Sequence, residues 1–474
     1  VTRSEGNPLF CEEFLRMLID DGRVVRVDDR WRARASVTEV RVPESIHTLL
    51  AARLDGLGED ERRLMQVASI VGERFGASDL GALAPGLDLP PALASLRRVG
   101  LVLEDRDSRD PDRYRFKHLL MRDVAYAGLP KAVRADLHER FAGELERSVG
   151  DRRDEFAEVL AHHAERAFSL SAEVRVHRDV LVPRAKRALA WVLGLGDRAR
   201  AREDTSLLGA NVAVATASLA TLNAEATAED QARVALLVAE DRRLSGQYGP
   251  AQEAFDRALD LAGAAGRIDL AAASHLGLAR VMVFASELDE LAFAEFDRHA
   301  TEATRLFTEA GQPGAALEAG LVALEPYFGS GKLGEMLRRG QALRERAREL
   351  GDGPRELLIC ARLIGAAGQA GRAELARGYA GAADELAARL GVRMPQWGRV
   401  ARCGRLRASG DFAAAEACQR ALHAESVAER DPLLQIASLR NLGELLLASG
   451  RPAEAGPVLE QALAESVRTG ELWS

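Results

Sequence analysis

The residue types best suited to metal binding gather at His162, His163 and Glu165, within one predicted helix. Imidazole nitrogens and carboxylate oxygens are common zinc ligands, so these residues are a candidate metal site. Adjacent residues on a helix point about 100° apart, however, and the His-Glu-x-x-His spacing that turns two imidazoles to one face is not present. The pattern therefore favours a structural pair of histidines on a packing face over a metal site.

Groups for other kinds of catalysis do not stand out from the helical background of charged residues. The sequence shows no Ser-His-Asp set, no Cys-His pair and no paired carboxylates suited to acid–base catalysis. The phosphate-binding loop Gly-x-x-x-x-Gly-Lys-[Ser/Thr] is not found either, so the backbone cradle and lysine that hold nucleotide phosphates are missing from this chain. We expect no enzymatic activity and only weak binding of ATP.

Two arginines, Arg97 and Arg98, end a predicted helix that precedes two short strands. In helix-turn-helix DNA binders, a helix in this position enters the major groove. Asp105 and Asp107 follow closely, and the chain has a formal net charge of -8, whereas a general nucleic-acid binder displays a basic face. Nucleic-acid binding is thus not expected, and a DNA-binding transcriptional regulator that uses this helix stays open as the alternative.

Length and composition limit the possible folds. With 474 residues the chain is too long for one core, and its many helix-favouring residues with only 5% aromatics predict a mainly α-helical protein of several domains. The cysteines share no Cys-x-x-Cys spacing, and no apolar run reaches about 18 residues. We therefore expect a cytoplasmic protein without a membrane span and with reduced cysteines. The cysteines are Cys11, Cys360, Cys403 and Cys418.

Hydrophobic periodicity divides the first third of the chain into short helices and two pairs of strands. Apolar side chains at helical spacing predict a helix over residues 8–21, and alternation then predicts a hairpin over 24–34. Pro43 opens another helix. Further helices are expected over residues 59–71, 78–84, 91–98, 119–127 and 131–148, and a second pair of strands over 100–104 and 114–118.

From about residue 152 onward the sequence is helical and repetitive. After Gly246, small and large residues follow in the order typical of the turn and second helix of a tetratricopeptide repeat, at Ala251, Phe255, Ala258 and Leu259. The same order returns after Gly450, at Ala455, Leu459, Ala462 and Leu463. Weaker copies begin at Ser286, Gly331, Gly371 and Gly410, so successive starts lie 39 to 45 residues apart. Each two-helix unit can bury its apolar face only against its neighbours, which predicts a helical solenoid.

Several short motifs between residue 6 and about residue 200 occur in a recognisable order. They are Gly6-Asn7-Pro8-Leu9-Phe10, Val42-Pro43-Glu44-Ser45-Ile46, Ala51-Ala52-Arg53-Leu54, Tyr114-Arg115-Phe116-Lys117-His118, Arg122-Asp123-Val124-Ala125-Tyr126 and Leu160-Ala161-His162-His163-Ala164-Glu165-Arg166-Ala167. In this order they resemble the region behind the nucleotide-binding core of bacterial STAND-type regulatory ATPases, which occur with nucleotide cyclase, LuxR-type or Ser/Thr kinase domains. The resemblance implies the end of an ATPase helical lid with a hairpin over 1–42, a winged-helix-like domain over 43–130, a helical linker over 131–200 and tetratricopeptide-like repeats over 201–474.

The resemblance also implies roles for three residues. Gly6 and Pro8 belong to the family's Gly-x-Pro motif, whose proline packs near the adenine, and His118 matches a winged-helix histidine that reaches the ADP phosphates. Leu119 follows His118 where the family pattern often has aspartate. From the residues alone, Pro8 also suits the first position of a helix, and His118 suits a partly buried, hydrogen-bonded place at the end of a strand. Both interpretations remain open.

Together these observations predict the regulatory and scaffolding portion of a STAND-type signal-transduction protein. The concave face of the repeats is expected to bind a protein or peptide. The winged-helix-like domain is expected to relay that event to the nucleotide-binding core that the resemblance implies. We expect no cofactor or metal in this chain, and ATP or ADP in the complete protein.

Overall fold

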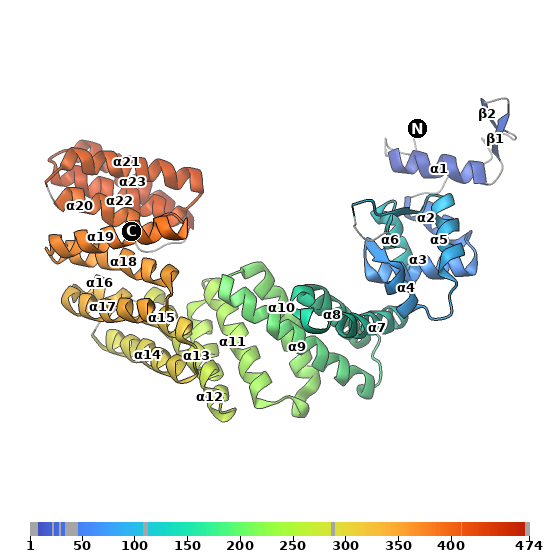
Figure 1. Cartoon of the computed structure of the whole chain (residues 1–474), viewed down its shortest axis with the longest axis horizontal. Helices are drawn as coiled ribbons and strands as arrows, with labels where there is room; N and C mark the ends of the chain where they lie inside the picture. The colour runs from blue at the N-terminus through green and yellow to red at the C-terminus, as the bar shows by residue number, and fades with distance from the viewer. Residues whose placement is uncertain are drawn as a thin grey trace. The chain divides into compact units, whose positions relative to one another are not determined.

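The computed structural model describes residues 8–20, 23–27, 30–33, 46–107, 112–285, 290–408 and 410–469. These residues are mainly α-helical and divide into two units, Val1–Ala226 and Thr227–Ser474 (Figure 1). The predicted fold class, a small domain of helices and strands followed by tetratricopeptide-like helical repeats, is confirmed.

Unit 1 begins with a helix and a hairpin. Helix α1 (Pro8–Asp20) leads into strands β1 (Val24–Val27) and β2 (Arg30–Ala33), which pair antiparallel. The helix and the hairpin expected from hydrophobic periodicity are both present.

Five helices and a three-stranded sheet follow, and residues 46–127 are called the helix-and-sheet domain below. The elements are α2 (Ile46–Asp55), α3 (Glu59–Val71), β3 (Arg74–Gly76), α4 (Ala77–Leu83), α5 (Leu89–Arg98), β4 (Val102–Glu104), β5 (Arg113–Phe116) and α6 (Leu119–Ala127). Strand β5 lies between β3 and β4 and is antiparallel to both. The hairpin β4–β5 was expected, whereas β3 was not, because three residues that include a glycine show no measurable alternation.

One apolar core holds the helix-and-sheet domain together. Phe75 of β3 and Phe116 of β5 are buried with their rings in edge contact, 5.4 Å between centroids. Leu50 of α2, Leu64 of α3 and Leu96 of α5 belong to the same buried cluster. This packing fixes the end of β5, and the residues that follow it, relative to helices α2 and α5.

Four longer helices complete unit 1, and each packs against the next. They are α7 (Lys131–Val149), α8 (Ala157–Glu173), α9 (Arg178–Arg202) and α10 (Thr205–Leu222). By length and composition alone, Thr205–Glu225 could cross a membrane, with a mean hydropathy of 1.4. The search for uninterrupted apolar runs in the sequence did not find this segment, because Ser, Thr and Asn interrupt it. Leu208, Ala215 and Leu222 of α10 are buried, so one face of this helix belongs to the packing of unit 1.

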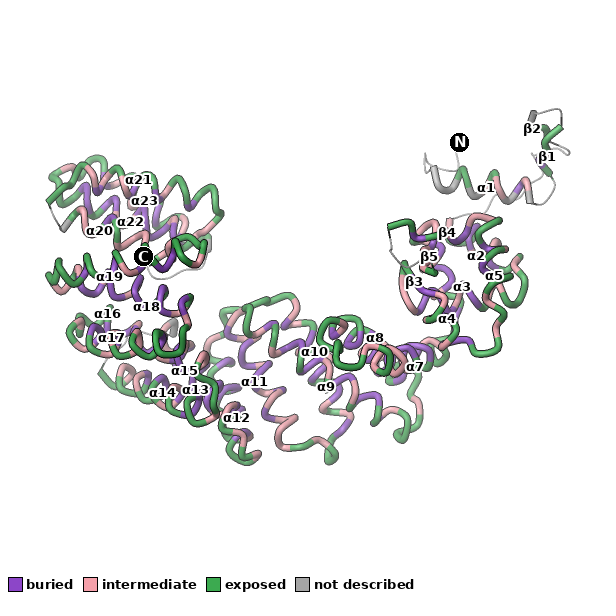
Figure 2. The backbone as a smooth tube through the Cα atoms, in the orientation of Figure 1, coloured by how far each residue is buried: buried purple, intermediate pink, exposed green. Residues whose placement is uncertain are grey.

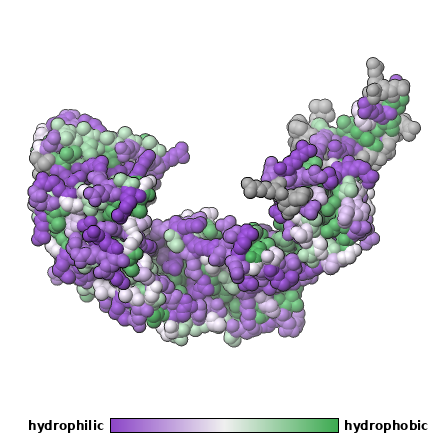
Figure 3. Space-filling view, viewed as in Figure 1, coloured by the Kyte–Doolittle hydropathy of each residue, from purple (hydrophilic) through white to green (hydrophobic). Residues whose placement is uncertain are grey.

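The described part of unit 2 is a stack of helices in which each packs against its neighbours. The helices are α11 (Ala228–Leu244), α12 (Tyr248–Ala264), α13 (Ile268–Ala285), α14 (Glu290–Glu309), α15 (Pro313–Val322), α16 (Glu325–Gly329), α17 (Leu333–Glu349), α18 (Gly353–Gln369), α19 (Ala373–Leu390), α20 (Gln396–Ala408), α21 (Phe412–Glu429), α22 (Pro432–Ala448) and α23 (Pro452–Thr469). Buried stretches recur where neighbouring helices face each other (Figure 2). Hydrophilic residues, with scattered apolar ones, cover the surface in view (Figure 3).

Glycines at regular intervals separate the helices of unit 2. The predicted repeat starts at Gly246, Gly331, Gly371, Gly410 and Gly450 all have φ between 70° and 82° and lie between the two helices of a pair. The other predicted start, Ser286, lies outside the described residues. A second series at Gly266, Gly311, Gly351 and Gly391 ends the second helices of the pairs. A turn thus recurs about every 20 residues, which gives repeats near 40 residues rather than the usual 34.

The hydrogen bonds at these turns show why glycine is used. After Gly246, the N–H of Gln247 donates to the carbonyl oxygen of Arg242 at 2.8 Å, and the N–H of Arg267 after Gly266 donates to Ala262 at 3.0 Å. This bond to the carbonyl five residues back ends a helix when the intervening residue is left-handed, a conformation that glycine adopts without strain.

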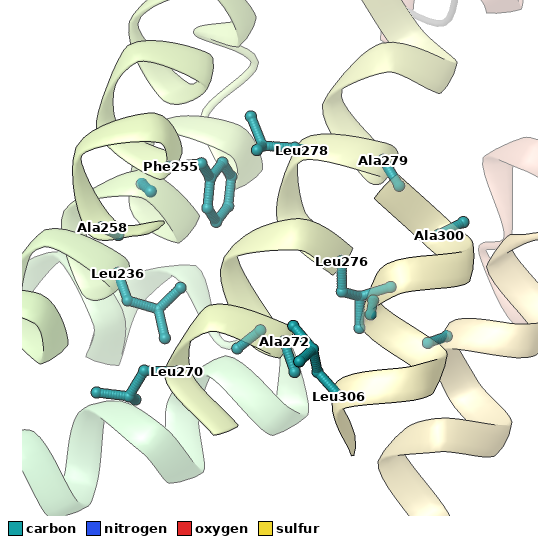
Figure 4. Close-up of a cluster of buried hydrophobic side chains, with 14 of the residues drawn as sticks. Leu236, Phe255, Ala258, Leu270, Ala272, Leu276, Leu278, Ala279, Ala300 and Leu306 are labelled. Atoms are coloured by element: carbon teal, nitrogen blue, oxygen red, sulfur yellow. The ribbon is translucent and has the colours of Figure 1, made fainter. Parts of the chain in front are cut away.

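Small residues allow close contact between the stacked helices. The alanines predicted at such contacts, Ala251, Ala258, Ala455 and Ala462, are all buried. Gly277 of α13 faces Phe255 of α12, and a Cβ added to the glycine would lie 2.1 Å from Cε1 of the ring. Phe255, Ala258 and Leu276 belong to one buried cluster (Figure 4). The aromatic ring therefore fills the space that glycine leaves.

The cysteines differ from the expectation that all four stay reduced and apart. Cys403 of α20 and Cys418 of α21 form a disulfide with Cα atoms 5.5 Å apart. The two helices follow each other across a short turn, so cysteines 15 residues apart meet on facing sides. Cys11 is an exposed thiol, and burial raises the pKa of the Cys360 thiol to about 11.

Candidate functional site

His118 lies between β5 and α6, with an extended backbone at φ -136° and ψ 135°. Its side chain is partly buried, and among the described residues its Nε2 atom has no hydrogen-bond partner. Burial, assisted by the charge of Lys117, lowers the pKa of the imidazole from its usual value. The structure therefore places a neutral imidazole, with one nitrogen unsatisfied by the described protein, at the end of the central strand.

Two arginines from different helices converge on one backbone carbonyl close to this strand. Arg16 of α1 and Arg53 of α2 donate to the carbonyl oxygen of Val99 at 3.3 and 2.7 Å. Gly100 follows with a φ of 71°, and a Cβ there would lie 2.6 Å from Nη1 of Arg16. Glycine thus permits both the left-handed turn after α5 and the approach of Arg16.

Lys117 and Glu12 tie α1 to the end of β5. Nζ of Lys117 donates to Oε1 of Glu12, and this hydrogen bond lowers the pKa of the carboxyl group. Arg16 lies 3.8 Å from the same carboxylate. Among the side chains that the structure describes, the junction of α1 with the helix-and-sheet domain thus brings the cations Arg16, Arg53 and Lys117 together with the carboxylate of Glu12. Positive charge beside a neutral imidazole attracts anions such as phosphate groups.

The other two residues of the predicted nucleotide site are less fully described. Pro8 is the first residue of α1, a position that suits its fixed φ, and its side chain is outside the description. Gly6 lies outside the described residues. The Glu12–Lys117 pair is one described link between α1 and the residues that join β5 to α6, where His118 lies.

Sequence reasoning did not single out Glu12, Arg16, Arg53 or Lys117. Two of them were inside the motifs that carry the resemblance, Arg53 in Ala-Ala-Arg-Leu and Lys117 next to His118. The contact of Arg16 and Arg53 with one carbonyl joins residues far apart in the chain, and no spacing in the sequence marks it.

The sequence predicted that His162 and His163 form a structural pair, but in the structure His163 pairs with a histidine of another helix. His163 of α8 is buried, and its Nδ1 lies 2.8 Å from Nδ1 of His138 in α7, whereas His162 is exposed. Nε2 of His138 lies 3.0 Å from the hydroxyl oxygen of Tyr126. His163 thus lies in the packed face, whereas His162 is exposed as a residue but still has its ring in contact with that of His138, at 6.0 Å between centroids. Within the described ranges, no group of three His, Cys, Asp or Glu residues could hold a metal ion.

A second pair of the same kind joins α13 and α14 in unit 2. Nδ1 of His275 lies 2.8 Å from Nδ1 of His299, and both side chains are buried. Burial lowers the pKa of His299 to about 4, and the pKa values of His138 and His163 to about 2 and about 3. In each pair one neutral imidazole donates its proton and the other accepts, which requires opposite tautomers.

The arginines at the end of α5 contact other groups of the helix-and-sheet domain. Arg97 forms an ion pair with Glu104 of β4, and Nη2 of Arg98 donates to Oγ of Ser95 at 3.0 Å. Arg74 of β3 pairs with Asp105 at 3.0 Å. These carboxylates offset the positive charge near α5, whereas DNA binding draws on uncompensated cations that neutralise phosphates.

Comparisons with known proteins do not assign this chain to a family. No family model and no curated protein matches the chain. A STAND protein with a tetratricopeptide repeat sensor from Pyrococcus horikoshii is 13% identical, with a TM-score of 0.45 over 98% of this chain and 68% of that chain. A Rap protein complexed with competence and sporulation factor is 13% identical, with a TM-score of 0.47 over 73% of this chain and 96% of that chain. The apo form of RapI is 10% identical, with a TM-score of 0.49 over 71% and 94%. At these values the likeness carries no argument, and the fold stands on the helices and turns described above.

Proposed function

We propose that this chain is the regulatory and scaffolding portion of a STAND-type signal-transduction protein. Its repeats bind a protein or peptide, and its helix-and-sheet domain relays that event to a nucleotide-binding core. The junction at His118 carries the proposal. It couples α1, the helix of the Gly-x-Pro motif, to the residues that follow β5 through Glu12 and Lys117. Among the described residues, it also places an imidazole nitrogen without a hydrogen-bond partner in the same junction as Arg16, Arg53 and Lys117.

The order of elements in the helix-and-sheet domain supports the relay. Helix α3, strand β3, helices α4 and α5, and the hairpin β4–β5 follow one another in the order of a winged helix. In a DNA reader α5 would enter the major groove. Here Arg97 at its end pairs with Glu104 of the hairpin, which favours contact with protein over contact with DNA.

The repeats of unit 2 support the scaffolding part. A stack of helix pairs buries its core between neighbours and leaves long helix faces on the surface. Surfaces of this kind suit extended partners such as peptides and other proteins. We place the partner on unit 2 for this reason.

The first prediction concerns nucleotides. The purified chain should hydrolyse no ATP and bind it weakly, because phosphoryl transfer requires charge positioned around the γ-phosphate and its magnesium ion. Calorimetry and a phosphate-release assay measure both properties. Low-micromolar affinity for ATP, or sustained turnover by the pure chain, would contradict the prediction.

His118 has its own test, in a protein that carries the nucleotide-binding core in addition to this chain. We expect His118→Ala to weaken ADP retention and to raise resting signalling, because in this proposal the imidazole contacts the phosphates. His47→Ala, at an exposed histidine of α2, is the matched control. If ADP affinity and resting activity stay unchanged in His118→Ala, the residue has only a structural role.

A titration of the full chain with DNA at two salt concentrations distinguishes the proposed relay function from sequence-specific DNA binding. We expect weak binding without sequence preference, and no further loss when Arg97→Ala and Arg98→Ala are combined. Specific DNA binding would fall steeply with salt and would depend on cations at the recognition helix. Saturable, sequence-selective binding that disappears in the double variant would establish the DNA-binding alternative.

A further inference from the structure

Helix α20 joins its neighbours differently from the other first helices of unit 2. At α12–α13, α14–α15, α17–α18 and α21–α22, the second helix of one pair packs extensively against the first helix of the next pair. Helix α20 contacts α19 only slightly and packs instead against α18 and α21. Within the described residues, the connection between the repeats up to α19 and the helices from α21 onward therefore depends largely on α20.

Apolar burial anchors α20 weakly. Gly398 and Cys403 are the buried residues among those that the structure describes in this helix, whereas α18 buries ten of its 17 residues. Ala401 is only partly buried against the core of the preceding repeats. Val400 is likewise partly buried, beside a small cluster that contains Cys403. Cys403 is thus the one described side chain of α20 that lies fully in a core.

Ion pairs at the surface also hold α20. Three of its arginines pair with carboxylates of α21, α19 and α22, namely Arg399 with Glu429 at 3.0 Å, Arg402 with Asp384 at 2.9 Å and Arg407 with Glu444 at 3.3 Å. The four side chains of the last two pairs are between 44% and 54% exposed. Exposed pairs contribute little to stability, because water and salt screen them. The disulfide between Cys403 and Cys418 is therefore the strongest described link between α20 and α21.

The disulfide restrains how far α20 can open. It joins cysteines 15 residues apart, on two helices that follow each other in the chain. A bond of this kind acts mainly on the opened states, because it keeps the two helices together even when their other contacts are lost. Reduction removes that restraint and leaves α20 with few buried side chains. Helices with little buried apolar surface open locally at low free energy.

A reductant reaches this bond more easily at Cys418 than at Cys403. Cys403 is 1% exposed, whereas Cys418 is only partly buried. A thiolate of a dithiol attacks Sγ of Cys418, forms a mixed disulfide and displaces the sulfur of Cys403, which takes up a proton. The second thiol of the reductant then displaces Cys418. The dithiol leaves oxidised to a disulfide, and both cysteines end as thiols.

We propose that the Cys403–Cys418 disulfide is a redox-sensitive lock on α20. In the oxidised chain α20 stays packed against α18 and α21, and the repeats on both sides of it form one stack. After reduction by a dithiol α20 opens more often, and the connection between these repeats loosens with it. This regulation goes beyond the proposed function, since it does not depend on which partner the repeats bind.

Hydrogen exchange of the full chain at one pH tests the lock, after treatment with oxidised glutathione and, separately, with dithiothreitol. Mass spectrometry of peptides should find Cys403 linked to Cys418 in the first sample and both as thiols in the second. We expect reduction to raise exchange rates in α20 at least tenfold. Helices α12 and α13, which contain no cysteine, should exchange at the same rates in both samples.

Two variants separate the disulfide from other effects of the reductant. Cys418→Ala removes the bond, so its α20 should exchange as fast as in the reduced chain and should not respond to dithiothreitol. Cys11→Ala, at the exposed free thiol of α1, is the matched control and should keep the full response. The unaltered chain in its two redox states gives the result by itself if Cys418→Ala folds poorly.

Four results would overturn the proposal. They are the absence of a Cys403–Cys418 link after treatment with oxidised glutathione, equal exchange of α20 in the oxidised and reduced chains, a uniform rise of exchange over all of unit 2 on reduction, and a full response to dithiothreitol in Cys418→Ala. None of them bears on the proposed relay or on partner binding, which are tested separately.

Discussion

Acidification from about pH 7 to about pH 5 should lower the free energy of unfolding by roughly 2 kcal/mol for each fully buried histidine. Burial holds the pKa of His138 at about 2 and that of His163 at about 3, whereas the usual value is 6.5. The folded state therefore binds these protons at lower pH than the unfolded chain does. Stability is lost progressively as the pH falls below about 6.5, and it is fully present above that value.

The positive charges around the histidine pair in unit 1 oppose its protonation. Arg122 and Arg166 lie near His138 and further lower its pKa, and its Nε2 faces the hydroxyl of Tyr126. In unit 2, His299 lies 2.7 Å from Nη2 of Arg298, while the carboxylate of Glu295 is 4.0 Å away. We therefore expect acid to loosen both the α7–α8 contact and the α13–α14 contact.

Thermal unfolding between about pH 7 and pH 5, above the range in which most carboxylates titrate, measures this effect. The double variant with His138→Phe and His163→Phe should flatten the pH dependence of the unit 1 transition, while His47→Gln at an exposed histidine should not. Hydrogen exchange in α7 and α8 of the unaltered chain gives a second readout if the double variant folds poorly. An unchanged slope in the folded double variant, or protection factors in α7 and α8 that do not change with pH once the intrinsic exchange rate is divided out, would contradict the assignment.

Replacing Gly277 by alanine should destabilise unit 2 by roughly 1–3 kcal/mol, because the new Cβ overlaps a packed ring. That Cβ would lie 2.1 Å from Cε1 of Phe255, which belongs to the buried cluster between α12 and α13, and Gly277 is itself buried. The matched control is Gly378→Ala in the middle of α19, where an added Cβ meets nothing within 4 Å. It should stabilise the helix by about 0.5–1 kcal/mol, since alanine is the better helix former.

Chemical denaturation of these two variants, of Phe255→Leu, and of Gly277→Ala combined with Phe255→Leu completes a double-mutant cycle. Leucine is smaller than phenylalanine, so the pair should be less destabilised than the sum of its single changes. Strict additivity, or equal effects of Gly277→Ala and Gly378→Ala, would show that the glycine and the ring are not in close contact.

The repeats could be predicted from the sequence because the pattern that marks them is local and recurs along the chain. Glycines such as Gly246, Gly331 and Gly371 end helices through hydrogen bonds within a few residues, so their spacing directly reports the turns. The apolar stripe of α1 and the alternation of β4 and β5 are local in the same way. Strand β3 was not predicted, because its three residues form a strand by pairing with β5, which follows only after two helices.

The unpredicted features all join residues that sequence spacing does not relate. His138 and His163 meet because α7 and α8 pack against each other, and Cys403 and Cys418 meet because α20 and α21 do. The cations at the His118 junction come from α1, α2 and the end of β5. Motif resemblance selected His118 but could not show which charges surround it.

Site-specific photo-crosslinking of the full chain, in the cells that make it, tests the central claim most directly. Crosslinking groups at the exposed positions Glu253, Ala342 and Ala421 report on unit 2, and one at the exposed Ala94 reports on α5. The account predicts adducts between unit 2 and a defined protein or peptide partner, and no adduct between Ala94 and DNA. DNA adducts at Ala94, with no protein or peptide adduct at any of the unit 2 positions, would contradict it.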